Sequence, residues 1–411
     1  MSKFRHAHLG LNLGLSFKLS LAALGFTLAP PLLGITSLAH AADTVRAEVG
    51  KPLQEAQRLA AAGKNKEALA KLHEADSIGG KTPFETYQVE YVRAAAAARA
   101  GDNASAIKAF EYVINSGRLP AAQVPNFTRG LATMYYTAKD WPKAIDWISR
   151  SLKEGENPQM RELLTQTYYV SGNYAAAAKE LQSHGGSSEA QLQMLANIQL
   201  KQGDKAGYVR TLEKLAGSYP KASYWADLLN RVSGKPDFSS RLSLDVQRLK
   251  LANGLITKPA EFMEMGQLAL QAGNPAEALK VVDKGYKTGA LGTGAEAARH
   301  QRLKDLAVKT QAESAKNAAS IEADLLKNKD ADGLAARGFA LVSDGQAEKG
   351  LALMNQALKM DGIKHPDEAK LHLGIAYSLA GKKANAIATL KTVQGADGTA
   401  DLARYWILQL S

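Results

Sequence analysis

The sequence contains no cysteine among its 411 residues. This absence excludes disulfide bonds, a thiol nucleophile and any metal site built from thiolates. The motifs G-x-S-x-G and H-E-x-x-H, which mark serine hydrolases and zinc peptidases, are also missing. The chain therefore lacks the usual signatures of several enzyme classes, while its 45% of hydrophobic residues is sufficient for a large core.

Acidic residues are absent from the first 41 positions, which carry the pattern of a secretory signal. A basic leader precedes an apolar stretch at 19–29, and Ala39 and Ala41 stand in the small-x-small arrangement that signal peptidase accepts. The alternative is an uncleaved anchor, because residues 19–38 reach the roughly 20 residues that span a bilayer. Two prolines interrupt that stretch. We therefore predict cleavage after Ala41, a periplasmic location and no transmembrane segment in the mature chain.

The net charge is positive, and the charged residues are scattered along the chain. The formal net charge is +11, and removing residues 1–41, which hold three basic residues and no acid, leaves +8. Interspersed charges are typical of an ordinary solvated helix surface. The alternative is attraction to an anionic partner in the envelope. Nucleic acid is not expected as a partner outside the cytoplasm.

A turn residue, usually glycine, recurs with a period in the mid-thirties, which is typical of helix–turn–helix arrays. At one of the turns the residue is lysine. Two of the intervals between successive turns are about twice the period. The turn positions are Gly63, Gly101, Lys139, Gly172, Gly203, Gly273, Gly345 and Gly381.

Small and large residues keep fixed distances from these turns. The residue seven places before the turn is small in all eight copies, and the residue five places after it is Ala or Gly in all but one, Tyr208. The residue nine places after the turn is always large and apolar. Two antiparallel helices can approach closely only where side chains are small, so each turn predicts a helix hairpin with a close crossing. The large residue is expected to fill the space where the helices splay. Stacked hairpins bury a continuous core and form a solenoid.

This pattern resembles the tetratricopeptide repeat, most clearly in KLHLGIAYSLAGKKANAIATL at 370–390. The resemblance covers residues 50–216 and 260–394 and implies an all-α, right-handed α-solenoid of about ten helix pairs. Residues 290–330 depart from the pattern but have the length of one further helix pair. The expected organisation is a signal peptide at 1–41, an N-terminal array at 42–218, a degenerate repeat or hinge at 219–258 and a C-terminal array at 259–411.

Three short strings imitate a serine active site. SAIK (105–108), SGN (171–173) and KTG (287–289) follow the order used by serine penicillin-recognising enzymes. Those enzymes place KTG on a strand, whereas the repeat places all three strings on helices or turns. His365 and His372 lie seven residues apart, unlike the i, i+4 spacing typical of zinc ligands on a helix, and we expect surface histidines. We therefore predict no catalytic residue, no metal and no cofactor.

The resemblance also implies a binding face, because the first helix of each pair lines the concave side of such arrays. Amides there can pair with a peptide backbone, and tyrosine rings can cover its side chains. The alternative is that the amides are merely solvated and the tyrosines fill gaps between helices. The implied partner-binding residues are Gln88, Tyr91, Asn126, Arg129, Tyr136, Gln159, Gln166, Tyr169, Gln193 and Asn197.

The equivalent positions of the C-terminal array are more apolar. Met263, Leu270, Leu371 and Ile375 could bind an amphipathic helix, form a dimer contact or be covered by the end of the solenoid. Taken together, the sequence predicts a non-catalytic scaffold of the bacterial cell envelope that binds a peptide segment or a partner protein. The competing hypothesis is a component that binds or exports an envelope polysaccharide.

Overall fold

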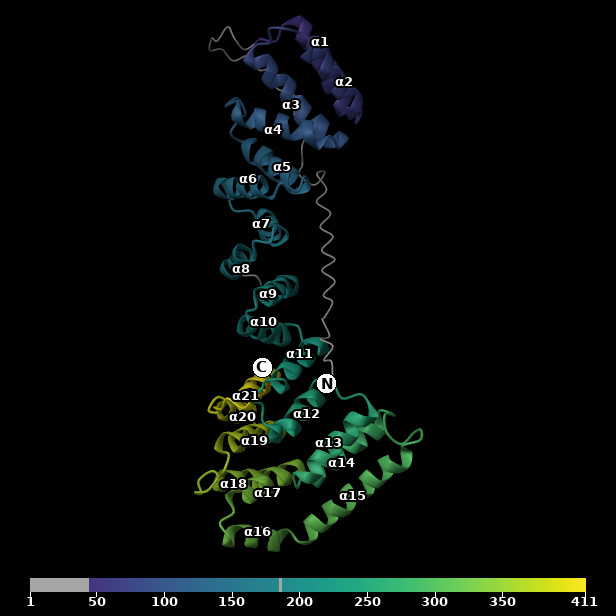
Figure 1. Ribbon diagram of the computed structural model, residues 1–411, viewed down its shortest axis with the longest axis vertical. Helices are drawn as coiled ribbons and strands as arrows, with labels where there is room; N and C mark the ends of the chain where they lie inside the picture. The colour runs from purple at the N-terminus through teal and green to yellow at the C-terminus, as the bar shows by residue number, and fades with distance from the viewer. Residues whose placement is uncertain (1–43, 185–186) are drawn as a thin grey trace. The chain divides into compact units, whose positions relative to one another are not determined.

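A computed structural model describes residues 44–184 and 187–411, which belong to two compact units that divide between residues 186 and 187. The described residues form helices and no strand (Figure 1), which confirms the all-α prediction. The predicted signal peptide lies outside the described residues. None of the described helices combines the length and the hydropathy of a bilayer-crossing helix.

Unit 1 contains four helix hairpins, each made of two consecutive helices (Figure 1). Two hydrophobic cores fill it, one over the first three helices and one from the third to the seventh. The helices are α1 (Ala47–Ala61), α2 (Asn65–Asp76), α3 (Pro83–Ala100), α4 (Asn103–Asn115), α5 (Val124–Thr137), α6 (Trp141–Glu154), α7 (Pro158–Val170) and α8 (Tyr174–Ser183).

Unit 2 contains five further packed pairs, the consecutive helices α15 and α16, which do not pack on each other as a hairpin, and a final helix. Its elements are α9 (Glu189–Gln202), α10 (Lys205–Ser218), α11 (Ala222–Ser233), the 3₁₀ turn Ser240–Leu242, α12 (Ser243–Ala252), α13 (Pro259–Gln271), α14 (Pro275–Lys287), α15 (Ala297–Lys316), α16 (Ala318–Lys327), α17 (Ala331–Ser343), α18 (Ala347–Ala357), α19 (Pro366–Leu379), α20 (Lys383–Leu390) and α21 (Thr399–Leu410). With the four pairs of unit 1, the described residues hold nine packed pairs, in line with the expected number of about ten.

All eight predicted turn residues have the left-handed backbone that ends a helix. Their φ angles lie between 59° and 90°, and Lys139 adopts 59° although it carries a side chain. The residue after the turn often caps the next helix: the side chains of Asp102, Asn173 and Asn274 each accept a hydrogen bond from a backbone N–H three residues on. The periodic turn residues in the sequence therefore mark the positions of the turns in the structure.

The small residues lie where paired helices cross. A Cβ added to Gly374 would lie 2.5 Å from Leu390 Cγ, and one added to Gly338 would lie 2.5 Å from Met354 Cγ. In these two copies the large residue nine places after the turn thus packs directly on the small residue seven places before it. The sequence predicted this close crossing but placed the large residue farther along, where the helices splay.

Enlarging a small crossing residue is expected to destabilise the stack. Ala278 and Ala386 are fully buried, and leucine at either position would force their helices apart. Overpacking of this kind typically costs about 1–3 kcal/mol of unfolding free energy. Thermal and urea unfolding would measure the loss, with Ala384→Leu on the exposed face of α20 as the matched control. Unchanged melting of Ala278→Leu and Ala386→Leu would contradict the close crossing.

A buried carboxylate ties the start of α1 to the start of α3 in unit 1. The Glu85 side chain is fully shielded and accepts hydrogen bonds from the Arg46 guanidinium, the Arg46 backbone N–H and the Thr82 backbone N–H. The hydrogen bond from the Arg46 side chain is the main cause that lowers the Glu85 pKa from 4.5 to about 2. Folding therefore favours the ionised form of this carboxyl group.

This pKa predicts a loss of stability in acid. Because the folded-state pKa lies below the unfolded value, the stabilisation is complete above about pH 4.5 and is lost as the pH falls towards 2. We expect the stability advantage of the wild type over Glu85→Gln to shrink across that window. Urea titrations at pH 6, 4 and 2.5 would measure it. The substitution Glu48→Gln, at an exposed glutamate of α1, serves as the control. A constant difference for Glu85→Gln would refute the assignment.

Unit 2 closes on itself. Successive contacts join α12 to α13, α13 to α14, α14 to α17, α17 to α19 and α19 to α21, and α21 contacts α12 again (Figure 1). Leu402, Tyr405 and Trp406 of α21 share one hydrophobic core with Trp225 of α11 and Val246 of α12. The last helix therefore seals a ring of helices instead of extending the stack.

The degenerate stretch 219–258 supplies two members of this ring region. Its helices α11 and α12 form a pair, as expected from its length, and Leu228 and Leu229 are fully buried. The compact units divide well before this stretch, at 186/187. The predicted domain ranges 42–218, 219–258 and 259–411 stay predictions.

Candidate functional site

The predicted binding residues of unit 1 begin with an aromatic row across α3 and α5. The Tyr91 ring stacks on Phe127 with ring centroids 5.5 Å apart, and its hydroxyl donates to Gln123 Oε1 at 2.9 Å. The ring centroid of Tyr87 lies 6.0 Å from that of Tyr91 on the same helix. Tyr91 therefore bridges two hairpins while remaining partly exposed.

The next two hairpins repeat this arrangement with amides. Tyr136 on α5 donates a long, 3.5 Å hydrogen bond to Gln166 Oε1 on α7, and Gln166 is buried. Arg129 donates to Asn126 Oδ1 within α5. Tyr169 meets Tyr174 edge to face at 5.7 Å. Tyr91 and Tyr136 thus each bridge neighbouring hairpins while remaining partly exposed, and Asn126 is exposed while it accepts the hydrogen bond from Arg129.

The remaining predicted residues are dispersed. Gln88 is half-buried on α3 and Gln159 is exposed at the start of α7. Gln193 and Asn197 lie on α9 in unit 2, where Gln193 donates to the Tyr224 hydroxyl at 2.6 Å. Binding by any of these residues stays a prediction.

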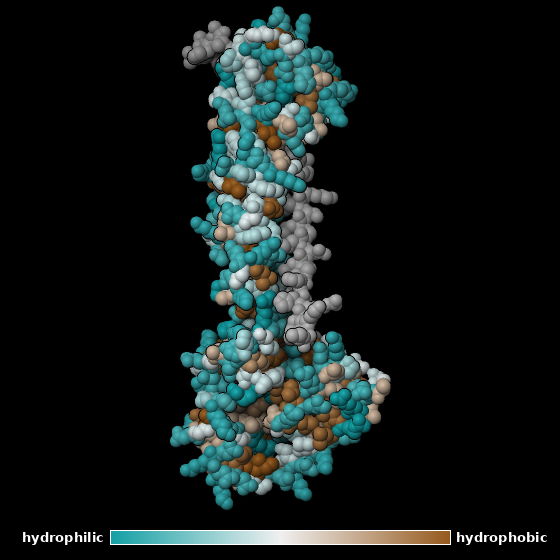
Figure 2. Space-filling model, viewed as in Figure 1, coloured by the Kyte–Doolittle hydropathy of each residue, from teal (hydrophilic) through white to brown (hydrophobic). Residues whose placement is uncertain are grey.

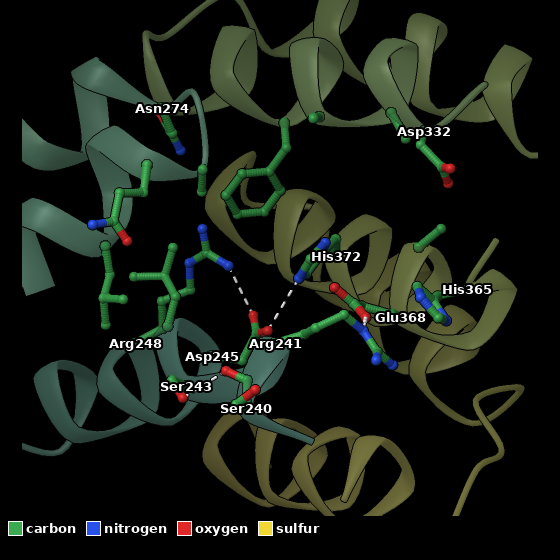
Figure 3. A pocket seen from close by; sticks show the side chains of 18 residues that line it. Ser240, Arg241, Ser243, Asp245, Arg248, Asn274, Asp332, His365, Glu368 and His372 are labelled. Atoms are coloured by element: carbon green, nitrogen blue, oxygen red, sulfur yellow. Dashed lines mark hydrogen bonds and ion pairs between the residues drawn. The ribbon is translucent and has the colours of Figure 1, made fainter. Parts of the chain in front are cut away.

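Unit 2 holds a pocket of about 460 Å³ inside its ring of helices (Figure 3). Side chains from α12, α13, α17 and α19 line it, so that three first helices of hairpins face the degenerate α12. Its volume lies within the roughly 300–1,000 Å³ of ligand pockets. Its lining is Ser240, Arg241, Ser243, Leu244, Asp245, Arg248, Leu268, Gln271, Ala272, Asn274, Asp332, Ala335, Ala336, Phe339, His365, Glu368, Ala369 and His372.

A buried charge network forms the floor of this pocket. Arg248 donates to Asp245 Oδ1 at 2.8 Å and to both oxygens of Glu277 at 2.7 and 2.6 Å. The other Asp245 oxygen lies 3.1 Å from His372 Nε2 on α19 (Figure 3). Arg248 also lies over the Phe339 ring, 4.4 Å from its centroid. One guanidinium therefore links α12, α14 and α17, because the repeat brings these helices round the same cavity.

Neighbouring polar groups extend the network. The buried Asn274 donates to Glu277 Oε2 at 2.9 Å and to Ser343 Oγ at 2.8 Å. Lys280 donates to the Ser343 carbonyl at 2.5 Å. These bonds fix Glu277, which in turn orients Arg248.

The network keeps Asp245 and Arg248 ionised. Burial raises the Asp245 pKa, but the charges of His372 and Arg248 outweigh it and hold that pKa below its usual range. Burial lowers the Arg248 pKa, whereas Glu277 and Asp245 raise it above the ordinary value. Desolvation is thus offset by pairing, as buried charges require.

A second ion pair borders the mouth of the pocket. Arg241 donates to Glu368 Oε2 at 3.0 Å and to Asp397 Oδ2 at 3.3 Å. Asp332 accepts a hydrogen bond from the Lys364 backbone N–H at 3.2 Å, and the Lys364 ammonium itself is largely exposed. Arg241 and His365 are exposed, so the site is open to solvent at this rim.

Several of these residues were missed or misread from the sequence. The expectation of a surface histidine is wrong for His372, which is partly buried against Asp245, because α12 and α19 face the same pocket in the closed ring. Leu371 and Ile375 are buried in the core shared with α21, so the solenoid's own end covers them. The charged pair Asp245–Arg248, three residues apart in a helix that also carries buried leucines, was the available signal. Within 44–184 and 187–411, no group of three or more acidic or histidine side chains could hold a metal.

Comparison with known proteins agrees with the repeat geometry. A model of the tetratricopeptide repeat family matches residues 91–161 in unit 1 and 336–401 in unit 2. No curated protein matches the sequence.

Among solved structures, the chain is similar to "Naa15/Naa10 bound to HypK-THB" (14% identity, TM-score 0.29), covering 84% of this chain and 58% of that one. It is also similar to the P58(IPK) TPR domain (15%, TM-score 0.23, 88% and 98% covered) and to yeast Tom70 (11%, TM-score 0.19, 87% and 94% covered). The family matches fall on the hairpins whose turns and crossings are described above. Residues 91–161 and 336–401 are therefore tetratricopeptide repeats.

Proposed function

We propose that this chain is a non-catalytic scaffold of a bacterial cell envelope that binds a peptide segment or a partner protein. Tetratricopeptide repeats generally act as protein-binding scaffolds, and this coarse function follows from the family. The observation that carries the proposal is the face of α3, α5 and α7 in unit 1. Partly exposed rings there lie beside amides, a mixture that suits a peptide backbone and its side chains.

The envelope location rests on the sequence of residues 1–41, with its basic leader, apolar stretch and Ala39–Ala41 site. Expression in a Gram-negative host followed by fractionation and N-terminal sequencing tests it. We expect periplasmic protein that begins at Ala42, and retention of the leader by an Ala39→Arg variant. Cytoplasmic protein with residues 1–41 intact would refute the export proposal.

Site-specific photo-crosslinking tests the binding face. A photoreactive phenylalanine at Tyr169 should form discrete adducts with envelope proteins, whereas the same group at Trp147, on the second helix α6, should form few. Arg129→Glu should reduce the Tyr169 adducts, while Arg150→Glu on α6 should leave them unchanged. Adducts with glycan alone would favour the polysaccharide hypothesis. Equal labelling from both helices would overturn the proposed face.

A further inference from the structure

The pocket of unit 2 has a chemical character that the repeat fold alone does not require. Its lining is mixed: Ala335, Ala336 and Phe339 of α17 and Ala369 of α19 are apolar, whereas charged side chains come from α12, α17 and α19, as the labels for Asp245, Asp332 and Glu368 show (Figure 3). An occupant must therefore present an apolar stem and a polar end. Basic side chains have this construction, since their methylene stems cover apolar surface while the charged head stays among polar groups.

The charges of the lining residues determine whether an occupant should be a cation or an anion. Three carboxylates, Asp245, Asp332 and Glu368, face two arginines. Both arginines are already paired: Arg248 with Asp245 and Glu277, and Arg241 with Glu368 and Asp397. Their charge is therefore matched before any ligand arrives, so an anion would have to break existing pairs.

Two carboxylates at the rim of the pocket, Asp332 and Glu368, can still accept hydrogen bonds from a ligand. The ion pair of Asp332 is with Lys364, at 3.9 Å, and the Lys364 side chain is 80% exposed. The Glu368 side chain is 18% exposed, so its charge is only partly shielded by water. Each of these carboxylates has a cationic partner that is partly or largely exposed, Lys364 for Asp332 and Arg241 for Glu368, and an apolar group would desolvate both carboxylates without adding a hydrogen bond, which is costly. A cation with several N–H donors satisfies them instead.

We propose that this pocket receives the side chain of a lysine or arginine from a partner polypeptide. The head group would lie between Asp332 and Glu368, with its stem along Ala335, Ala336 and Ala369. The inference rests on the proposed protein-binding function and adds the chemistry of the partner. It places the contact in unit 2, apart from the residues that the sequence assigned to binding in unit 1.

Selection of a random-heptapeptide phage library on the full chain tests this inference. We expect lysine or arginine to be enriched at one position of the selected peptides. A synthetic copy of the best peptide should bind at least about tenfold more weakly when that residue is replaced by citrulline or norleucine, which keep the stem and remove the charge.

Paired variants assign the binding to the pocket. Asp332→Asn with Glu368→Gln should weaken the selected peptide at least about tenfold, while Asp324→Asn with Glu348→Gln removes the same charge elsewhere in unit 2 and should have no effect. Circular dichroism melting confirms that both double variants fold.

Other outcomes overturn the inference in distinguishable ways. Selected peptides without basic residues, or binding that ignores the Asp332 and Glu368 substitutions, would refute the basic side chain and leave the scaffold function standing. Absence of any selected peptide would also refute it. Absence of crosslinked protein partners as well would remove the proposed function too.

Discussion

Replacing Arg248 by methionine is expected to lower the unfolding free energy by about 3–5 kcal/mol, because the change leaves buried carboxylates without their cation. Asp245 is fully buried and Glu277 is largely so, and the guanidinium supplies hydrogen bonds to both. Methionine keeps much of the aliphatic volume, so the loss reflects charge rather than a cavity. Urea unfolding monitored by circular dichroism measures the difference.

The matched control for this variant is Arg299→Met, which removes the same group from an exposed ion pair with Glu296. Exposed pairs contribute about 0–1 kcal/mol, so this control should change little. The triple variant Arg248→Met, Asp245→Asn, Glu277→Gln should recover part of the stability, since no uncompensated charge remains. If Arg248→Met behaves like Arg299→Met, the floor of the pocket is not held by charge pairing.

Deleting residues 399–411 is expected to cost more than about 5 kcal/mol and to unfold most of unit 2. The deletion removes Leu402, Tyr405 and Trp406 from the core and uncovers Leu371 and Ile375. Each such side chain stabilises the fold by about 1.5–3 kcal/mol when buried, and a domain has only about 5–15 kcal/mol in all. Hydrogen exchange with mass spectrometry should show lost protection from α10 to α20, with unit 1 unaffected.

A point variant tests whether unit 2 depends on the packing of α21 while the helix itself is still present. Leu402→Asp places a charge at a fully buried position and should reproduce the loss of protection, whereas Asn385→Asp on the exposed face of α20 should not. Normal protection in Leu402→Asp would mean that unit 2 does not depend on closure by its last helix.

The fold could be predicted from the sequence because its determinants are local. The turn residues and the small crossing residues lie within sixteen positions of their partners, as in Gly338 and Met354. Even Lys139 was placed correctly at a turn, since the period left room for no other residue, and it adopts the left-handed backbone. Hairpin geometry thus follows from spacing alone.

The pocket of unit 2 could not be predicted in this way. Arg248 and Glu277 are 29 positions apart, and Asp245 and His372 are 127 apart, so their contacts depend on how many hairpins separate them. The stretch that contributes Asp245 and Arg248 is also the one where the repeat pattern fails. A residue pattern fixes which helices pair, but the closure of a ring depends on the summed rotation of every hairpin within it.

The sealed ring of unit 2 has a consequence for its evolution. An open array tolerates duplication of a hairpin, because the new copy merely lengthens the stack. In unit 2 an extra hairpin between α13 and α19 would carry α21 away from α12 and break the contacts that join the two ends. We expect related chains to vary in hairpin number within unit 1 and to conserve it from α12 to α21.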